Sequence, residues 1–379
     1  MSTTEIIVVS VLGFALAWQL FYWAFFMFRV RRKPRNLASS LPDVSIVICA
    51  RNEEDNLGRL IPVLIAQKYA GKKQIVVVDD CSTDDTPLIL ARLRAQYPDE
   101  LYTTTIPTDS VFHHGKKLAM TVGIKAAKHE HILFTDADCL PASENWLTLM
   151  MEGYATKGVE LVLGYGRYAK RPGLLNLMLR YETFWNAVQY FGMARAVKPF
   201  MGVGRNLSYT KQLFERSSKF RKHLYVLSGD DDLFVSEMGH RSNTAIVFEK
   251  SSQTVSEPKR TWLTYSAQKS RHLTTASLYP GVVKFWLVTE QATRLLFWLG
   301  TAATVALGLY LKSDILLIAA SAAFGLRTIL TYTAMGLAAR NMGEGHLWLL
   351  ALPMDIMVPW MQSLAWITGR LTQTSKTWK

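Results

Sequence analysis

The sequence contains only three cysteines, at Cys49, Cys81 and Cys139. They are too few and too far apart for a zinc-type ligand set. Each follows an apolar run, so we expect three buried thiols in a reducing cytosol. No G-x-G-x-x-G or G-x-x-x-x-G-K-[ST] sequence follows the first predicted strand, which argues against a dinucleotide dehydrogenase or a P-loop ATPase. Between Asp43 and about Ser277 the sequence also lacks internal repeats and low-complexity tracts.

Charged residues make up only 19% of the chain, yet the net charge is +13 at pH 7. On a soluble protein this basic excess would suggest a nucleic-acid partner. Here the apolar residues gather in long runs near both ends of the sequence. We therefore expect an integral membrane protein that contacts lipids and binds no nucleic acid.

The first apolar run, Glu5–Phe28, is long enough to cross a bilayer, which needs roughly 20 residues. It is too long for the core of a signal peptide, and no small-residue cleavage site follows it, so a cleaved signal is the weaker alternative. A basic cluster follows at once, formed by Arg29, Arg31, Arg32, Lys33 and Arg35. Because basic flanks stay in the cytoplasm, residues 1–35 predict a membrane helix with Met1 outside and the next domain inside.

Further apolar segments lie near the C-terminus, at about Thr293–Leu311, Ile315–Leu337 and Leu347–Ile367. Arg327 and Asp355 lie within the second and third, where charges usually face protein or water, so we expect them to pair with each other or with lipid phosphate. Pro353 and Pro359 predict that the last segment is kinked or re-entrant. Residues 278–379 therefore predict an interfacial helix and about three membrane segments.

Four full crossings would leave the basic tail, with Lys376 and Lys379, outside the cell, against the positive-inside bias. Either the last segment does not cross completely or the bias fails here. Two aromatic and aliphatic stretches, Leu174–Gly192 and Leu278–Val288, suit helices that lie in the membrane interface. For the first stretch a core helix is the alternative. We expect a multi-pass protein of the plasma (inner) membrane.

Residues 43–277 have the residue pattern of a soluble domain. Three apolar, β-branched runs predict strands covered on both faces, at Val44–Ala50, Gln74–Asp80 and His131–Asp138. Helical patterns lie between them, at residues 53–67, 84–97 and 116–128. This alternation predicts an α/β fold with a mostly parallel sheet, whose ligand binds beyond the carboxyl ends of the strands.

Acidic residues follow each of the three strands, and carboxylates that converge on one sheet edge repel each other unless a cation lies among them. Magnesium typically takes one or two carboxylates together with phosphate oxygens. The pair Asp136 and Asp138 therefore predicts a metal–diphosphate at this edge. Lys116, at a predicted helix start, either meets the same phosphate or caps a solvated helix end.

Seven motifs occur in a characteristic order: ARNEE, VVVDDCSTD, GKKLAM, FTDAD, GVGRNLSY, SGDDDLF and QKSRH. Together they resemble the family 2 glycosyltransferases with a GT-A fold, over about Val44–His272. The membrane-embedded branch is most similar, and it includes cellulose, hyaluronan and poly-N-acetylglucosamine synthases and ceramide glucosyltransferase. The resemblance implies a cytoplasmic GT-A domain at 43–277, a Rossmann-like sheet flanked by helices, with transmembrane helices at both ends.

The resemblance also implies a nucleotide-sugar donor, most often UDP-linked. The donor-binding residues that it implies are Asn52, Glu53, Asp79, Asp80, Lys116, Asp136, Gln268 and Arg271. The first two would lie beside the base and ribose, and the aspartates after the second strand would face the uracil. Asp136 and Asp138 would bracket the ribose and a Mg²⁺ or Mn²⁺ ion, while Lys116 would help to hold the diphosphate.

In this family an aspartate of a T-E-D or G-D-D motif deprotonates the acceptor hydroxyl, and the matching residue here is Asp231. Asp230 and Asp232 stay open as alternatives. Crowded acids raise the pKa of one member, which suits a general base. An acidic helix cap is the structural alternative for this motif. A single displacement of this kind inverts the anomeric carbon.

The acceptor side departs from the family pattern, because His272 replaces the tryptophan of Q-x-x-R-W that stacks on the acceptor in polymerising members. Processive synthesis is therefore in doubt. Gly202 and Arg205 lie in FMGVGRN, where the synthases carry an acceptor-contacting loop. We expect an inverting, membrane-bound enzyme of the cell envelope that acts on a lipid-linked or glycan acceptor. A processive polysaccharide synthase, a nucleotidyltransferase and a non-catalytic sugar-nucleotide-binding scaffold are the alternatives.

Overall fold

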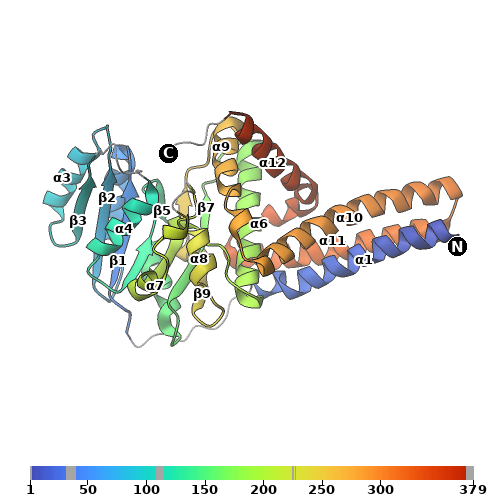
Figure 1. The fold of residues 1–379 in the computed structure, drawn as a ribbon, viewed down its shortest axis with the longest axis horizontal. Helices are drawn as coiled ribbons and strands as arrows, with labels where there is room; N and C mark the ends of the chain where they lie inside the picture. The colour runs from blue at the N-terminus through green and yellow to red at the C-terminus, as the bar shows by residue number, and fades with distance from the viewer. Residues whose placement is uncertain (1, 31–39, 108–114, 224–225, 227, 373–379) are drawn as a thin grey trace.

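The computed structural model describes residues 2–30, 40–107, 115–223, 226 and 228–372. An α/β domain occupies one end of the molecule, and a bundle of long helices extends from it to the N-terminus (Figure 1). Of the predicted basic flank, only Arg29 lies within the described residues. The basic tail residues Lys376 and Lys379 lie outside them as well.

The main sheet has seven strands among the described residues, in the order β3-β2-β1-β4-β8-β6-β9. Strand β8 is antiparallel to both of its neighbours, and the other pairs are parallel. The bounds are β1 Val44–Ala50, β2 Lys73–Asp80, β3 Leu101–Ile106, β4 His131–Phe134, β6 Leu161–Gly164, β8 Leu207–Thr210 and β9 Thr244–Val247. A smaller sheet joins β5 Cys139–Pro141, β10 Thr254–Ser256 and β7 Gly166–Tyr168.

Alternation of side chains along the strands divides the core between the two faces of the sheet. On one face, Val47 and Val78 share a cluster with residues of α4 and α6. On the other, Ile46 and Ile48 pack with residues of α2, α3 and α5. The helices are α2 Glu54–Ile65, α3 Thr86–Gln96, α4 Lys116–Ala126, α5 Trp146–Met151, α6 Leu174–Ala196, α7 Lys211–Arg216 and α8 Asp232–Met238. This arrangement confirms the predicted α/β fold, because strands covered on both faces are apolar throughout.

Short 3₁₀ turns connect several of these elements. They span Met27–Arg29, Glu152–Ala155, Gly204–Asn206, Arg221–His223, Lys250–Ser252, Ala276–Leu278 and Leu347–Leu350. Helix α4 approaches the sheet closely at Gly123, where an added Cβ would lie 2.5 Å from Cγ1 of Val47. A side chain there would push α4, and with it Lys116, away from the sheet.

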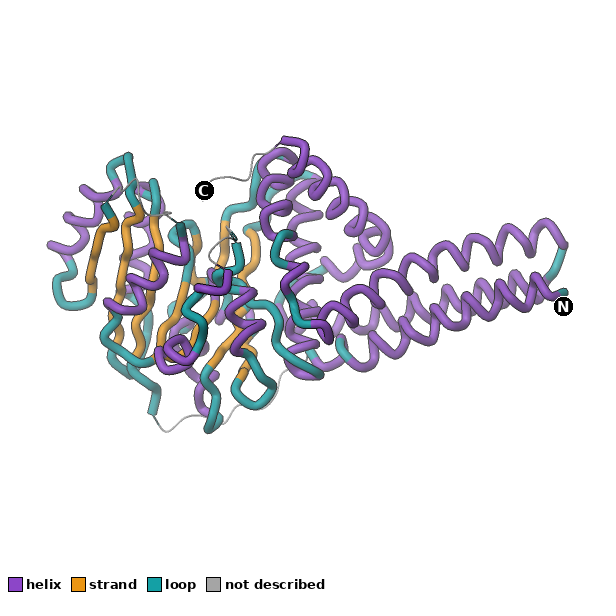
Figure 2. The backbone as a smooth tube through the Cα atoms, in the orientation of Figure 1, coloured by secondary structure: helices purple, strands orange, loops and turns teal. Residues whose placement is uncertain are grey.

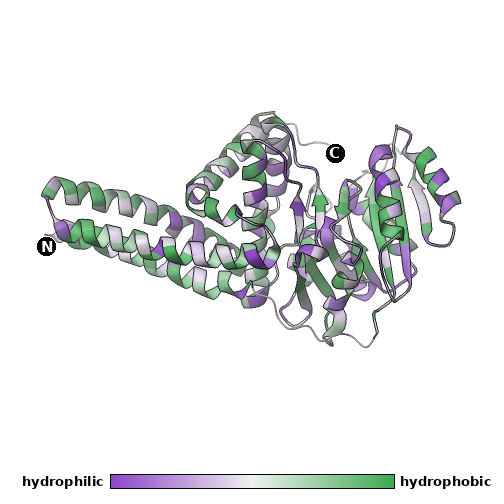
Figure 3. Cartoon of the chain, turned by 180° about the vertical axis from the view of Figure 1, so that it is seen from behind, coloured by the Kyte–Doolittle hydropathy of each residue, from purple (hydrophilic) through white to green (hydrophobic). Residues whose placement is uncertain are grey.

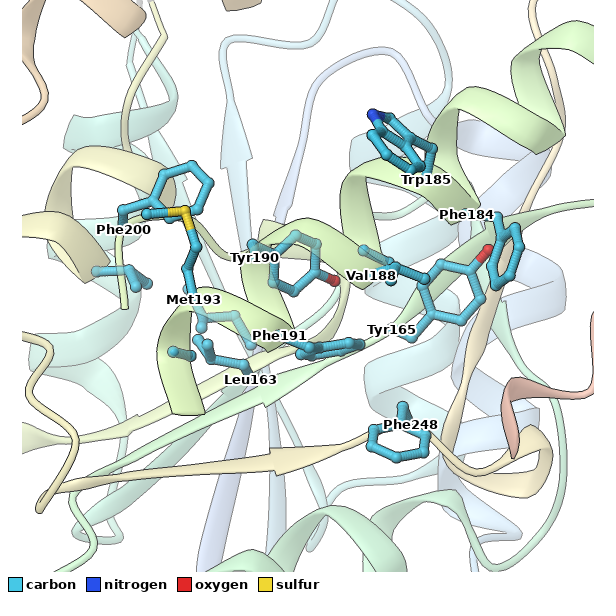
Figure 4. Packing of buried hydrophobic residues seen from close by; sticks show 14 of the residues in the cluster. Leu163, Tyr165, Phe184, Trp185, Val188, Tyr190, Phe191, Met193, Phe200 and Phe248 are labelled. Carbon is cyan, nitrogen blue, oxygen red and sulfur yellow. The ribbon is translucent and has the colours of Figure 1, made fainter. Parts of the chain in front are cut away.

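Helix α6 is a core helix and not an interfacial one, so the interfacial interpretation of residues 174–192 is wrong. Its aromatic side chains pack against the sheet and its neighbours (Figure 4). The Tyr190 hydroxyl donates to the backbone oxygen of Gly164 at 3.0 Å. The composition of this stretch resembles that of an interfacial helix because α6 lies between the sheet and the long apolar helices, and both of these surroundings are apolar.

Three long helices lie side by side in the bundle: α1 Thr3–Phe25, α10 Gly281–Leu311 and α11 Asp314–Met342 (Figures 1 and 2). Each is long and apolar enough to cross a membrane. Figure 3 shows that the bundle is mostly hydrophobic, and large apolar side chains such as Phe14, Leu299 and Ile318 are exposed on it. The stretch predicted to lie in the interface, Leu278–Val288, is mostly the beginning of α10, so it is continuous with the span.

The last helix, α12 Ala351–Thr372, is also long and apolar enough to cross a membrane. It lies beside α6 and α9 (Trp262–Leu273), at the end of the bundle nearest the α/β domain (Figure 1). Both sequence alternatives for the last segment stay predictions.

Buried polar side chains tie the four apolar helices together. Nη1 of Arg327 lies 2.8 Å from Oδ2 of Asp355, which confirms the predicted pairing between α11 and α12. Oε1 of Gln19 on α1 accepts from the same guanidinium at 2.9 Å, and the Trp298 indole of α10 donates to Asp355 at 2.8 Å. The pair therefore fixes how α12 docks on the bundle.

We expect Arg327→Met to lower the free energy of unfolding by about 3 kcal/mol, because it leaves the buried Asp355 carboxylate short of its main counter-charge. Thermal unfolding in detergent measures the loss. The double variant Arg327→Met/Asp355→Leu should recover part of it, since it removes both charges. A double variant less stable than Arg327→Met would contradict this account.

Candidate active site

A cavity of about 620 Å³ lies beyond the carboxyl ends of β1 and β4 and extends to α6, α9, α10 and α12. Ten of the residues predicted from the sequence line it. They are Glu53, Lys116, Asp136, Asp138, Arg205, Asp230, Asp231, Gln268, Arg271 and His272. Segments from the N-terminal and C-terminal parts of the α/β domain therefore line one cavity, which extends to α10 and α12.

Four predicted site residues do not line this cavity: Asn52, Asp79, Asp80 and Gly202. Oδ1 of Asn52 accepts from the Thr83 amide at 2.8 Å, so this side chain organises the loops after β1 and β2. Asp79 and Asp80 are 1% and 0% exposed. The end of β2 therefore lies beside the cavity. The prediction that the ends of all three strands line one site is wrong for β2. A role of Asp79 toward uracil stays a prediction.

Lys116 is the cation among the converging acids. Its Nζ lies 2.8 Å from Oδ1 of Asp136 and 3.3 Å from Oδ2 of Asp230, so it joins the end of β4 to the turn before α8. Burial alone would lower the pKa of Lys116, but the carboxylates of Asp136, Asp230 and Asp231 raise it well above its ordinary value. The ammonium group therefore stays charged and is available to an anionic ligand.

The three consecutive aspartates have different surroundings. They follow Gly229, whose φ of +90° is a conformation that glycine adopts without strain. Asp230 pairs with Lys116, whereas Asp232 accepts from the Tyr279 hydroxyl at 2.7 Å and from Thr275. Asp232 is therefore occupied in holding the segment between α9 and α10.

Asp231 is the aspartate best placed to act as a base. Its Oδ2 accepts from the Gly204 amide at 2.8 Å and its Oδ1 from the Asp232 amide at 2.8 Å. These two bonds orient the carboxylate without neutralising it. Burial, followed by the negative charges of Asp230 and Asp232, raises the pKa of Asp231 to about 7. A general base works best with a pKa near the working pH.

If Asp231 is the base, the rate at saturating substrate should rise as the pH increases through about 7, because only the ionised carboxylate accepts a proton. The raised pKa places this rise well above the ordinary range of an aspartate. Initial rates measured across this pH range test the prediction. An unchanged rate on both sides of neutrality would contradict it.

The residues around Asp138 fit a hard divalent cation. Ligand atoms of Asp136, Asp138 and Cys139 lie within 4.8 Å of one another. Burial raises the pKa of the Cys139 thiol well above its ordinary value, and the thiol lies 2.9 Å from the Ser256 hydroxyl, so it stays protonated. The carboxylates are left as ligands. Partial desolvation at the wall of the cavity, and then the charge of Asp136, raise the pKa of Asp138, and a cation would relieve this repulsion.

The cysteine prediction is correct only in part. All three cysteines are free, but only Cys139 is buried, while Cys49 and Cys81 are half-buried. Cys49 is the last residue but one of β1, and it lines the cavity. An apolar run places its residues in the sheet, but it does not say how close the site lies to the end of the strand.

Helix α9 carries Gln268, Arg271 and His272 into the cavity. The His272 side chain is accessible from the cavity, and partial desolvation there, followed by the cations Arg271 and Lys269, lowers its pKa, which favours the neutral ring. An imidazole without charge offers a hydroxyl-rich ligand a donor and an acceptor together.

Sequence reasoning missed the residue that holds α9 in place, Glu182 of α6. Its carboxylate accepts from Tyr265 at 2.9 Å and from Gln362 at 3.0 Å, and Lys269 lies 2.6 Å away. One buried acid thus joins α6, α9 and α12. The available signal was an isolated glutamate in an aromatic helix, which is seldom buried without partners.

The comparisons with known proteins agree with this fold. Residues 45–206 match the model of glycosyl transferase family 2. A mannosyltransferase from Pyrobaculum calidifontis, solved in complex with GDP-Man and Mn²⁺, superposes with a TM-score of 0.55 at 22% identity. The match covers 89% of this chain and 97% of that one, which shows a shared GT-A fold.

Among curated proteins, glycosyltransferase AglE of Haloferax volcanii is 28% identical over 52% of this chain and 60% of its own length. A beta-monoglucosyldiacylglycerol synthase of Nostoc is 34% identical over 31% of this chain and 24% of its own length. A poly-beta-1,6-N-acetyl-D-glucosamine synthase of Staphylococcus aureus is 25% identical over 30% and 26%. The chain thus spans at most 60% of these relatives.

The α/β domain therefore has a GT-A fold with an acid-lined cavity at the carboxyl ends of its strands. Residues 45–206 within this domain are similar to glycosyl transferase family 2.

Proposed function

We propose that the protein is a membrane-bound inverting glycosyltransferase that moves a sugar from a nucleotide sugar, UDP-linked by preference, to a hydroxyl of a lipid-linked or membrane-proximal acceptor. The observation that carries this proposal is the single cavity that joins Asp231 and Lys116 to residues of α10 and α12. The catalytic domain would lie on the cytoplasmic side of the plasma membrane, as the basic flank after α1 predicts.

In this mechanism the acceptor hydroxyl gives its proton to Asp231 while its oxygen attacks the anomeric carbon. The bond from that carbon to the diphosphate oxygen breaks on the opposite face, so the configuration inverts. Negative charge grows on the departing nucleoside diphosphate, and the positive groups of Lys116 and Arg271, which line the cavity, would stabilise it. Asp230 positions Lys116 through their ion pair.

A divalent cation, Mg²⁺ or Mn²⁺, would be held by Asp138 and Asp136 and would neutralise charge on the diphosphate when bound. His272 lies on the same α9 face as Gln268 and Arg271 and would contact the acceptor, while Gln268 would contribute to donor binding. Arg205 also lines the cavity; its guanidinium lies 4.8 Å from the centre of the Tyr168 ring and donates to the Gly166 backbone oxygen. Glu53 lines the cavity and would lie toward the nucleoside of the donor.

A donor screen tests this proposal directly. Detergent-solubilised protein is incubated with UDP-sugars and GDP-sugars and a native lipid extract, and the release of nucleoside diphosphate is followed. We expect release from one donor class together with a labelled single-sugar lipid. Long polymer would identify a processive synthase instead, and pyrophosphate would identify a nucleotidyltransferase. Donor binding without any turnover would indicate a scaffold.

A further inference from the structure

Resting on the proposed function, we infer that the membrane-side half of the cavity binds an uncharged, polyhydroxylated headgroup, such as the sugar or glycerol headgroup of a neutral lipid acceptor. We call this part the amide subsite. It consists of Thr183, Asn186 and Gln189 of α6, Gln291 of α10 and Gln362 of α12, all of which line the cavity.

The α6 side of the amide subsite is a stripe of polar residues on a buried helix. Thr183, Asn186 and Gln189 are spaced three residues apart, and they are the only partly accessible positions of the described chain from residue 181 to 194. Their aromatic and aliphatic neighbours are buried (Figure 4). None of the three side chains makes a hydrogen bond to another described residue, so their polar atoms are available to a ligand in the cavity.

The opposite wall adds amide groups from two membrane helices. Gln291 lies on α10 among exposed apolar residues, and Gln362 of α12 donates to Glu182 at 3.0 Å. A carboxamide both donates and accepts hydrogen bonds, as a hydroxyl does. Several amides around one space therefore match a ligand with several hydroxyl groups. Leu287 and Val358 also line the cavity, where they could contact the first methylene groups of a lipid.

The charges that border the amide subsite argue against a phosphate headgroup. Lys269 lies 2.6 Å from the Glu182 carboxylate. Arg294 lies between Glu290, at 3.4 Å, and Asp355, at 3.6 Å, and its guanidinium is 5.6 Å from the Trp185 ring centre. Both cations are thus neutralised by acids, whereas Lys116 and Arg271 lie toward the donor. A phosphate would have to break a buried ion pair to gain a counter-charge here.

The test uses the full-length protein in mixed vesicles with the donor identified by the screen. The acceptor probes are diacylglycerol and glycosyl-diacylglycerol on one side and a polyprenyl phosphate on the other. We expect the neutral acceptors to give at least 10-fold higher kcat/KM. Asn186→Leu and Gln189→Leu should each raise the acceptor KM about 10-fold, with a much smaller change in the donor KM.

The matched control is Gln96→Leu, which removes an exposed amide from α3, far from the cavity. Gln291→Leu serves as a second cavity variant, because this exposed position tolerates an apolar residue and the protein should fold. Preference for the polyprenyl phosphate, or unchanged acceptor KM values in the cavity variants, would overturn the inference while leaving the proposed function intact. Absence of turnover with every donor and acceptor would instead reject both.

Discussion

Asp231→Asn should lower kcat about 1,000-fold while nucleotide binding stays close to that of the unmodified protein. Removing a positioned general base typically costs between about 100-fold and 10,000-fold in rate. The amide keeps the size of the side chain and can still accept from the Gly204 amide, so the fold around α8 should persist. Release of nucleoside diphosphate measures the rate, and binding of a fluorescent nucleotide measures the affinity.

Two comparisons make this result specific. Asp99→Asn, an exposed acid outside the cavity, should have no effect on the rate. Asp232→Asn should act mainly on stability, because this carboxylate holds Tyr279 and Thr275. If Asp231→Asn retained most of the activity and Asp230→Asn did not, the base would have to be reassigned to Asp230.

Asp138→Ala should abolish metal-dependent turnover, with a loss of at least about 100-fold, the usual cost of removing one electrostatic stabiliser of a developing anion. The protein should stay folded and inserted in the membrane, because the Asp138 side chain faces the cavity and is well exposed there. Rates are measured while Mg²⁺ or Mn²⁺ is titrated. EDTA should remove the activity of the unmodified protein, and added metal should restore it.

Asp99→Ala is the control for loss of a carboxylate, and it should keep both its rate and its metal dependence. Wild-type rates in Asp138→Ala, or full activity in EDTA, would show that Asp138 and Asp136 hold no catalytic metal. The amide-subsite variants provide an independent reference, since they should alter acceptor use and leave the metal dependence unchanged.

The fold could be predicted well from the sequence because the residue patterns that indicate strands and helices are local. Apolar strands such as Val44–Ala50 alternate with amphipathic helices, and this alternation alone indicates a covered parallel sheet. The membrane helices were predicted for the same reason, since length and hydropathy are properties of one segment. The pairing of Arg327 with Asp355 was also predicted, because two buried charges in apolar helices need partners.

The sequence did not distinguish an interfacial helix from a core helix. The segment at 174–192 has the composition of an interfacial helix, but in the fold it lies between a sheet and a bundle. Both environments select apolar and aromatic residues, so composition cannot distinguish them. The role of Glu182 was missed for a related reason: its partners, Tyr265, Lys269 and Gln362, are distant in sequence and meet only after α9 and α12 have docked on α6.

The sequence by itself determined the kinds of residue at the strand ends, the acids of the G-D-D motif and the apolar spans. Tertiary structure decided which of them share one cavity: it brought Asp231, Lys116 and His272 together and left Asp79 and Asp80 beside it. It also gave each aspartate of the motif its own partners. The reason is that burial and periodicity can be inferred from neighbouring residues. The distances between charged groups, which determine their pKa values and their access to the cavity, depend instead on segments hundreds of residues apart.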